Sequence, residues 1–61
     1  MDDLIPIGHF ARMSRLSIKA LRHYDDQRLL APAWVDPSSG YRYYRPAQAN
    51  RAEAIRILRL V

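Results

Sequence analysis

The side chains with the clearest chemical potential are basic, and they recur at helical spacing. Lys19, Arg22 and His23 fall at positions i, i+3 and i+4, which places them on one face of a helix. Another base, Arg42, stands among three tyrosines at residues 41–44. Nine of the ten bases are arginine, whose planar guanidinium can grip a phosphate with two parallel hydrogen bonds. These residue types predict a surface that contacts phosphate groups.

The overall charge agrees with that prediction. The 61-residue chain has a net charge of +4 and a pI near 10.1. Residues 1–36 carry five bases and five acids, so residues 37–61 hold the whole excess. A pI above about 9 in a small domain favours nucleic acid as the partner, and an acidic protein or membrane surface is the alternative.

Composition excludes several other classes of protein. Cysteine is absent, which excludes disulfides and thiolate metal sites within this stretch. The hydrophobic fraction of 49% is too high for a disordered tail, and the apolar runs are too short to span a membrane. No charged segment followed by an apolar one opens the chain as in a signal peptide, so we expect a cytoplasmic protein.

Candidate catalytic and metal-binding residues do not form a site. Asp25 and Asp26 are neighbours in a predicted helix, so their side chains diverge by about 100°. Asp25 is expected to pair with a nearby arginine instead. His9 and the adjacent acids at residues 2–3 do not have the spacing of metal ligands. Ser17 has no base placed beside it by any pattern. We therefore expect no enzyme activity, no metal and no cofactor.

The elements that carry the basic residues begin with two short helices. Apolar residues Ile7, Phe10 and Ala11 form one stripe and predict a first helix over residues 7–13. Residues 14–16 break that pattern. Ser17 can then accept a backbone hydrogen bond as the N-cap of a second helix.

The second helix is predicted over residues 18–27, with Ile18 and Leu21 facing inward. Two short helices joined by a three-residue break form a helix-turn-helix, here at about residues 7–27. In such a unit the second helix enters a DNA groove. Its N-terminal half would present the basic face defined above.

A β-hairpin follows at about residues 33–44. Two strand-like segments, 33–35 and 41–44, flank the turn residues 36–40. Alternation places Tyr41 and Tyr43 on one face, with Arg42 and Tyr44 on the other. Because an isolated hairpin is unstable, we expect Trp34 and one pair of tyrosines to lean on the helices.

A third helix is predicted over residues 46–61, starting at Pro46. Its inward stripe is Ala49, Ala52, Ile55 and Leu58. A second stripe, Ile57, Leu60 and Val61, has no visible partner, and the helix ends without a stop signal. We therefore expect that the chain is a truncated piece of a longer protein.

These segments together resemble a known family. The residues that carry the resemblance are Ile7-Gly8, Leu16-Ser17-Ile18-Lys19-Ala20-Leu21-Arg22-His23-Tyr24-Asp25, Leu29-Leu30-Ala31-Pro32 and Asp36-Pro37-Ser38-Ser39-Gly40-Tyr41-Arg42-Tyr43-Tyr44. The run is similar to the N-terminal DNA-binding domain of MerR transcription regulators, over about residues 5–61. It looks most like the multidrug-sensing branch.

The resemblance implies a mainly α, winged helix-turn-helix domain over residues 1–61. It implies a homodimer joined by a C-terminal antiparallel coiled coil, bound to a near-palindrome between two promoter elements. In that family, an effector bound by the C-terminal part makes the dimer distort the spacer DNA for RNA polymerase, a form of control that depends on DNA shape.

The resemblance also implies the DNA-contacting residues. They are Ser17, Lys19, Arg22, His23 and Tyr24 on the second helix, Tyr41 and Arg42 on the wing, and Arg59 on the third helix. Arginine pairs bidentately with guanine, so Arg22 is the best candidate to read a base, whereas Arg42 is expected to reach phosphate. Relatives often carry a capping box where Pro6 and His9 stand here, and tyrosine where His23 stands.

Two alternatives stay open. A small basic module could dock on an acidic protein surface, and the uncovered stripe that includes Ile57 gives that interpretation some support. A free-standing architectural winged helix would bind DNA without responding to an effector. A longer natural chain would argue against the architectural alternative.

Overall fold

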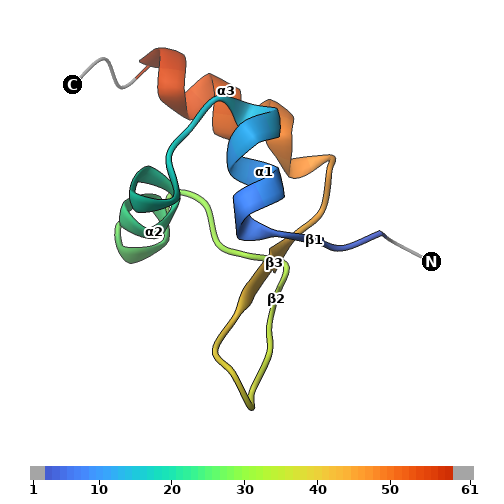
Figure 1. Ribbon diagram of the computed structural model, residues 1–61. Helices are drawn as coiled ribbons and strands as arrows, with labels where there is room; N and C mark the ends of the chain where they lie inside the picture. The colour runs from blue at the N-terminus through green and yellow to red at the C-terminus, as the bar shows by residue number, and fades with distance from the viewer. Residues whose placement is uncertain (1–2, 59–61) are drawn as a thin grey trace.

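Three helices and a small antiparallel sheet make up the domain. The computed structural model describes residues 3–58, and Figure 1 shows the hairpin extending away from the packed helices. In chain order the elements are β1 (Ile5–Pro6), α1 (Ile7–Ser14), α2 (Ile18–Asp26), β2 (Trp34–Val35), β3 (Arg42–Tyr44) and α3 (Gln48–Leu58). The predicted mainly α, winged helix-turn-helix fold is confirmed.

Helix α1 begins and ends through backbone geometry. Pro6 is the N-cap and provides no side-chain hydrogen bond, as expected where the capping box is missing. At the other end Arg15 adopts the left-handed conformation with φ 59°, and the Leu16 amide donates to the Ala11 carbonyl at 2.9 Å. Such a left-handed residue ends a helix sharply, so it sets the turn of the helix-turn-helix.

Helix α2 begins as the sequence predicts. The Ser17 hydroxyl accepts a hydrogen bond from the Ala20 amide at 3.0 Å, and Leu21 is fully buried. The prediction that Ile18 faces inward is wrong, because its side chain is 41% exposed. Ile18 Cδ1 lies over Gly8, and a β-carbon added to that glycine would be 4.0 Å away from it. Since glycine offers no side chain to cover it, the Ile18 side chain stays partly open to solvent.

The sheet contains a strand that the sequence did not reveal. Its order is β1-β3-β2, and Ile5 of β1 pairs with Tyr44 of β3. Strand β2 pairs on the other side of β3, with Trp34 opposite Tyr43. A two-residue strand that ends in proline has no alternation to detect, so β1 was not predicted.

Strand alternation divides the aromatic residues as predicted. Tyr41 and Tyr43 contact each other edge to face, with ring centroids 5.5 Å apart, whereas Tyr44 is buried on the opposite face. The expectation that Trp34 leans on the helices is wrong. Trp34 is 47% exposed and packs on Tyr43, because directly opposed residues of an antiparallel pair share a face.

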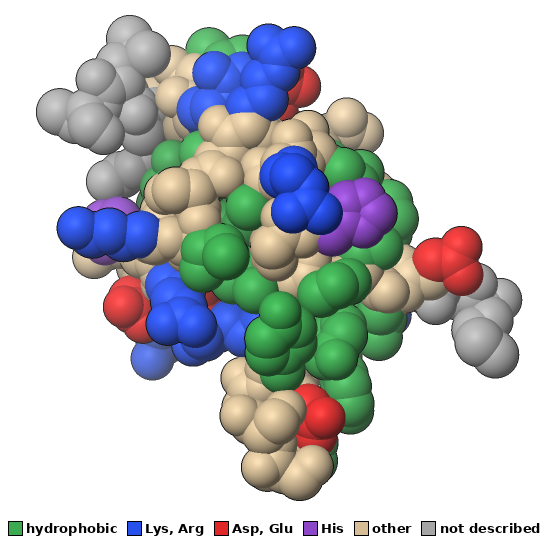
Figure 2. Space-filling model, viewed as in Figure 1, with side chains coloured by type: hydrophobic (Ala, Val, Ile, Leu, Met, Phe, Trp, Pro, Cys, Tyr) green, Lys and Arg blue, Asp and Glu red, His purple; other side chains and the backbone are tan. Residues whose placement is uncertain are grey.

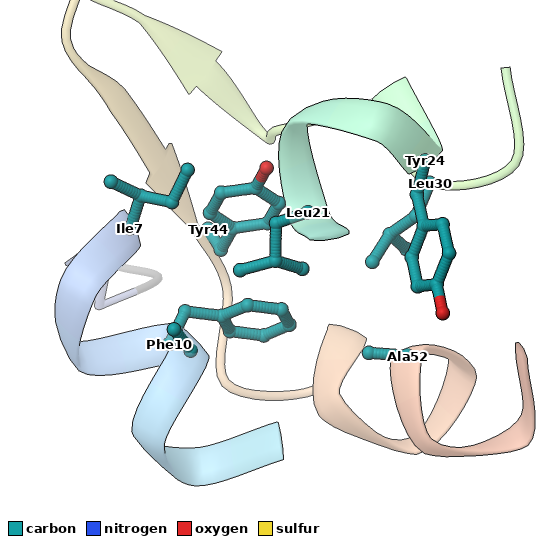
Figure 3. Packing of buried hydrophobic residues seen from close by; sticks show 8 residues of the cluster. Ile7, Phe10, Leu21, Tyr24, Leu30, Tyr44 and Ala52 are labelled. Carbon is teal, nitrogen blue, oxygen red and sulfur yellow. The ribbon is translucent and has the colours of Figure 1, made fainter. Parts of the chain in front are cut away.

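The core lies where α1, α2, α3 and β3 meet. Phe10 of α1 stacks on Tyr44 of β3 with ring centroids 4.4 Å apart and an interplanar angle of 10°. Figure 3 shows Leu21 of α2 and Ala52 of α3 directed toward this pair. This contact between distant segments anchors the wing strand to the helix-turn-helix.

Helix α3 begins at Gln48, two residues later than predicted, after a turn at residues 45–47. The Gln48 side chain accepts from the Arg45 amide and donates to the Ala31 carbonyl, both at 2.8 Å. Ala52 is buried as predicted, with Ala49 and Ile55 packed against the core.

The end of α3 departs from the predicted inward stripe. Leu58 is 81% exposed, because the last described turn lies beyond the end of α1 (Figure 1). Ile57 is exposed, as expected for the uncovered stripe. Leu60, Val61 and the predicted contact residue Arg59 lie outside the described residues.

Candidate nucleic-acid interface

Helix α2 and the wing together form one basic surface. Lys19, Arg22 and His23 of α2 are all exposed, as their helical spacing predicts. A shallow depression of about 120 Å³ separates α2 from the hairpin. Its lining residues are Ile7, Arg22, Ser39, Gly40, Tyr41 and Arg42. The structure therefore brings the predicted helix residue Arg22 together with both predicted wing residues.

Arg42 also contacts α2 directly. Its Nε donates to Asp25 Oδ2 at 3.4 Å, and the two side chains are 29% and 26% exposed. The sequence predicted an arginine partner for Asp25, and the structure shows that this partner is the wing arginine. A guanidinium has five N–H donors, so a bond at Nε leaves the terminal nitrogens for another acceptor.

Ser17 and Tyr24 each have a structural role. The Ser17 hydroxyl caps α2 through its bond to the Ala20 amide, and the residue is exposed. Tyr24 is only 8% exposed and belongs to the core cluster. Its carbonyl accepts hydrogen bonds from the Leu29 and Leu30 amides. Any contact of Tyr24 with DNA would therefore be made by the hydroxyl edge of a packed ring.

Local hydrogen bonds shape the tip of the wing. Asp36 Oδ1 accepts from both the amide and the hydroxyl of Ser38, each at 2.9 Å, and these bonds lower the pKa of Asp36. Gly40 has φ +76°, a conformation that side chains disfavour. Ser39 and Gly40 line the depression but were not predicted as site residues. In the sequence they were marked only as turn residues between the two strands of the hairpin.

A buried hydroxyl lies behind the basic surface. Among the described residues Tyr44 Oη has no hydrogen-bond partner. Burial raises the pKa of Tyr44, and the Asp25 charge raises it further. Because an unpaired buried hydroxyl lowers stability, Tyr44 contributes through its ring rather than its polar tip.

Another face of the hairpin is apolar. A larger depression of about 440 Å³ is lined by Leu4, Ala33, Trp34 and Arg45. Figure 2 shows hydrophobic side chains running down the hairpin, with basic side chains gathered beside them on the α2 side. The smaller depression is the better candidate for nucleic acid, since two arginines from different elements border it.

Two further observations concern the described part of the chain. Within residues 3–58, no group of three or more His, Asp or Glu side chains is arranged to hold a metal ion. None of the helices formed by these residues is long and apolar enough to cross a membrane.

Comparison with known proteins identifies the family. The sequence matches the MerR HTH family of regulatory proteins over residues 5–60. The chain belongs to the MerR family. The match spans the helix-turn-helix, the wing and α3, so it includes every described element that borders the basic surface. Family membership supports DNA binding and transcription regulation as the class of function.

Two curated MerR-type relatives align with nearly all of the chain. The Multidrug-efflux transporter 1 regulator of Bacillus subtilis is 42% identical over 55 residues, which are 90% of this chain and 20% of the relative. The Transcriptional regulator BrlR of Pseudomonas aeruginosa is 43% identical over 56 residues, 92% of this chain and 21% of the relative. The chain thus spans about a fifth of the length of these relatives.

Proposed function

We propose that this domain binds promoter DNA sequence-specifically as one half of a dimeric, MerR-like transcription regulator. One observation carries the proposal: Arg22 of α2 and Arg42 of the wing border the same depression, beside the exposed Lys19 and His23. A recognition helix reads base edges in the major groove. The wing would then meet the phosphates alongside that groove.

The proposed roles follow from the place of each side chain. Arg22 reads a base edge, because an exposed arginine on a recognition helix can bond guanine bidentately. Phosphate contacts hold the protein in register. We assign them to Ser17, Lys19, His23 and Tyr24 on α2, Tyr41 and Arg42 on the wing, and Arg59 after α3.

The regulatory part of the proposal concerns the whole protein. A segment C-terminal to this domain joins two copies through a coiled coil and binds an effector. The dimer then distorts the promoter spacer and changes access by RNA polymerase in the cytoplasm. One relative is named as a regulator of a multidrug-efflux transporter, which favours control of small-molecule export as the output.

An anisotropy titration tests DNA recognition. The 61-residue chain is joined through a flexible linker to a C-terminal dimerising coiled coil, and circular dichroism confirms its helices. One duplex carries the near-palindrome upstream of the protein's own gene, and the control duplex carries the same bases scrambled. We expect a preference of about 10³ at physiological salt.

The salt dependence provides a second expectation. If the basic side chains of each half neutralise about four phosphates, the dimer neutralises about eight, so log affinity should fall with log salt at a slope of about −7. Equal and strongly salt-dependent binding to both duplexes would contradict sequence recognition. It would favour the architectural alternative. Absence of binding would favour the protein-interaction alternative.

A further inference from the structure

The wing and the recognition helix are joined by one polar contact. Within residues 3–58, the 3.4 Å contact between Arg42 Nε and Asp25 Oδ2 is the only hydrogen bond or ion pair between α2 and the hairpin. The other described hydrogen bonds of the wing join the strands of the sheet or lie within the turn. Thus this pair is the direct polar link between the two elements that border the basic depression.

The rest of the hairpin is held by its own strands and turn. The Asp36 amide donates to the Tyr41 carbonyl at 2.9 Å, and the Gly40 amide donates to the Asp36 carbonyl at 2.7 Å. Tyr44, at the base of β3, is locked into the core against Phe10. Arg42 lies two residues from that anchor on the same face of the strand, where the core no longer holds its side chain.

An acid in this position needs an explanation. A carboxylate beside a DNA-binding surface repels phosphate, so its charge alone weakens binding. The neighbouring Asp26 is an exposed acid with no hydrogen bond or ion pair to other described residues. Asp25 differs from it because its carboxylate is only 26% exposed and bonds Arg42. The one described contact through which Asp25 can favour DNA binding is therefore its bond to Arg42.

The chemistry of arginine allows that contribution. A side chain with several rotatable bonds loses conformational freedom when it is fixed on a ligand. Asp25 bonds the Nε edge of Arg42 before any ligand arrives, so part of this ordering is already complete. The terminal nitrogens can still donate to a phosphate oxygen, and Arg42 borders the depression where that phosphate would lie.

We propose that Asp25 is a positioning residue for DNA binding: it fixes Arg42 of the wing relative to α2, so that Arg22 and Arg42 meet the DNA as one rigid surface. This inference rests on the proposed function, since it gives an acidic residue an indirect part in holding the DNA. Asp25 itself does not contact DNA.

The decisive comparison is Asp25→Asn against Asp26→Asn in the dimerised chain. Each variant removes one negative charge from the same helical turn. Charge alone predicts tighter binding in both. Positioning predicts opposite signs: Asp26→Asn binds the cognate duplex equally or more tightly, whereas Asp25→Asn binds about fivefold more weakly for each half-site. Tighter binding by both variants would overturn the proposal.

A second background separates positioning from a general loss of fold. With Arg42→Ala already in place, Asp25 has no guanidinium to hold, so Asp25→Asn should then behave like Asp26→Asn. A fivefold loss that persists in this background would show that Asp25 acts by another route, and would also overturn the proposal. Arg42→Lys keeps the charge but loses the planar donor set, so it should resemble Asp25→Asn in the parent.

Hydrogen exchange in the DNA-free protein gives a readout that does not depend on binding. The amides of Ala33 and Asp36 donate to carbonyls of Tyr43 and Tyr41 across the hairpin. They should exchange faster in Asp25→Asn than in Asp26→Asn, and equal rates would contradict coupling of the wing to α2. A parent that fails to prefer its cognate duplex refutes the proposed function itself. A parent with that preference but equal variants refutes only the role of Asp25.

Discussion

The helical core and the wing are held by different kinds of interaction. In the core, Phe10, Leu21 and Tyr44 are fully buried and packed on one another. In the wing, Trp34, Val35 and Tyr41 are exposed, and the tip depends on short-range turn bonds. The core therefore sets most of the stability, whereas the exposed side chains of the wing and of α2 can be replaced with little effect on folding. Substitutions in the core should change the free energy of unfolding, whereas substitutions of exposed residues on α2 and the wing should change DNA binding.

The largest expected effect is on the core. Phe10→Ala removes a fully buried ring that stacks on Tyr44 and should lower the free energy of unfolding by about 3–5 kcal/mol. Urea denaturation followed by circular dichroism measures the loss. Met13→Ala in the same helix is the control, because Met13 is exposed. Similar losses for both variants would contradict the position of the core.

Arg22→Ala tests the exposed basic face of α2. It should weaken binding to the cognate duplex by about 1–3 kcal/mol and reduce discrimination against the scrambled duplex. Because Arg22 is exposed, the unfolding free energy should change by less than about 0.5 kcal/mol. Anisotropy and urea denaturation of one preparation measure both. Equal affinity losses on the two duplexes would contradict base reading.

The two glycines provide a matched pair across the regions. Gly40 in the wing has φ +76°, so Gly40→Ala should destabilise the protein by about 1 kcal/mol. Gly8 lies within α1, and a β-carbon there makes only ordinary contact with Ile18 at 4.0 Å. Gly8→Ala should therefore stabilise by about 0.5–1 kcal/mol. Thermal unfolding of both variants checks the opposite signs, and a shared sign would contradict the local backbone geometry.

The smallest expected effect concerns the buried hydroxyl of Tyr44. Tyr44→Phe removes an unpaired polar atom and should stabilise the protein by about 1 kcal/mol or less. Burial raises the folded-state pKa of Tyr44 above its ordinary value of 10.0. Below pH 10 the tyrosine is neutral in both states, so its ionisation does not change the free energy of unfolding. As the pH rises from there toward the folded-state pKa, the unfolded chain ionises first and the free energy of unfolding falls.

The pH series separates Tyr44 from the other tyrosines. Urea denaturation of parent and Tyr44→Phe from about pH 8 to 11 should show a larger loss for the parent above about pH 10. The difference between the two proteins removes the contribution of groups that they share. Parallel curves would indicate that the Tyr44 hydroxyl is solvated and titrates normally.

Sequence reasoning was most successful where short-range rules decide the structure. The stripe Ile7, Phe10 and Ala11 gave α1, and the Ser17 hydroxyl gave the start of α2. Strand alternation separated Tyr43 from the buried Tyr44. The pairing of Asp25 with an arginine was also predicted, but only the fold could select Arg42.

The errors arose where long-range packing decides. Ile18 and Leu58 fit apolar stripes, yet within residues 3–58 no neighbouring element buries them. Trp34 follows its strand partner to the open face of the hairpin. The basic depression requires residues from α1, α2 and the wing tip, and sequence spacing cannot show that these segments converge. The assignments of DNA-contacting residues stay predictions.

DNA binding at the surface formed by α2 and the wing is tested most directly by an amide chemical-shift titration of the dimerised chain with the cognate duplex. We expect the largest changes at residues 17–23 of α2 and residues 39–42 of the wing, and small changes at Leu4 and Trp34 on the apolar face. That result would locate the DNA on the surface shared by Arg22 and Arg42. Changes concentrated at Leu4 and Trp34, with α2 unaffected, would contradict DNA binding at that surface.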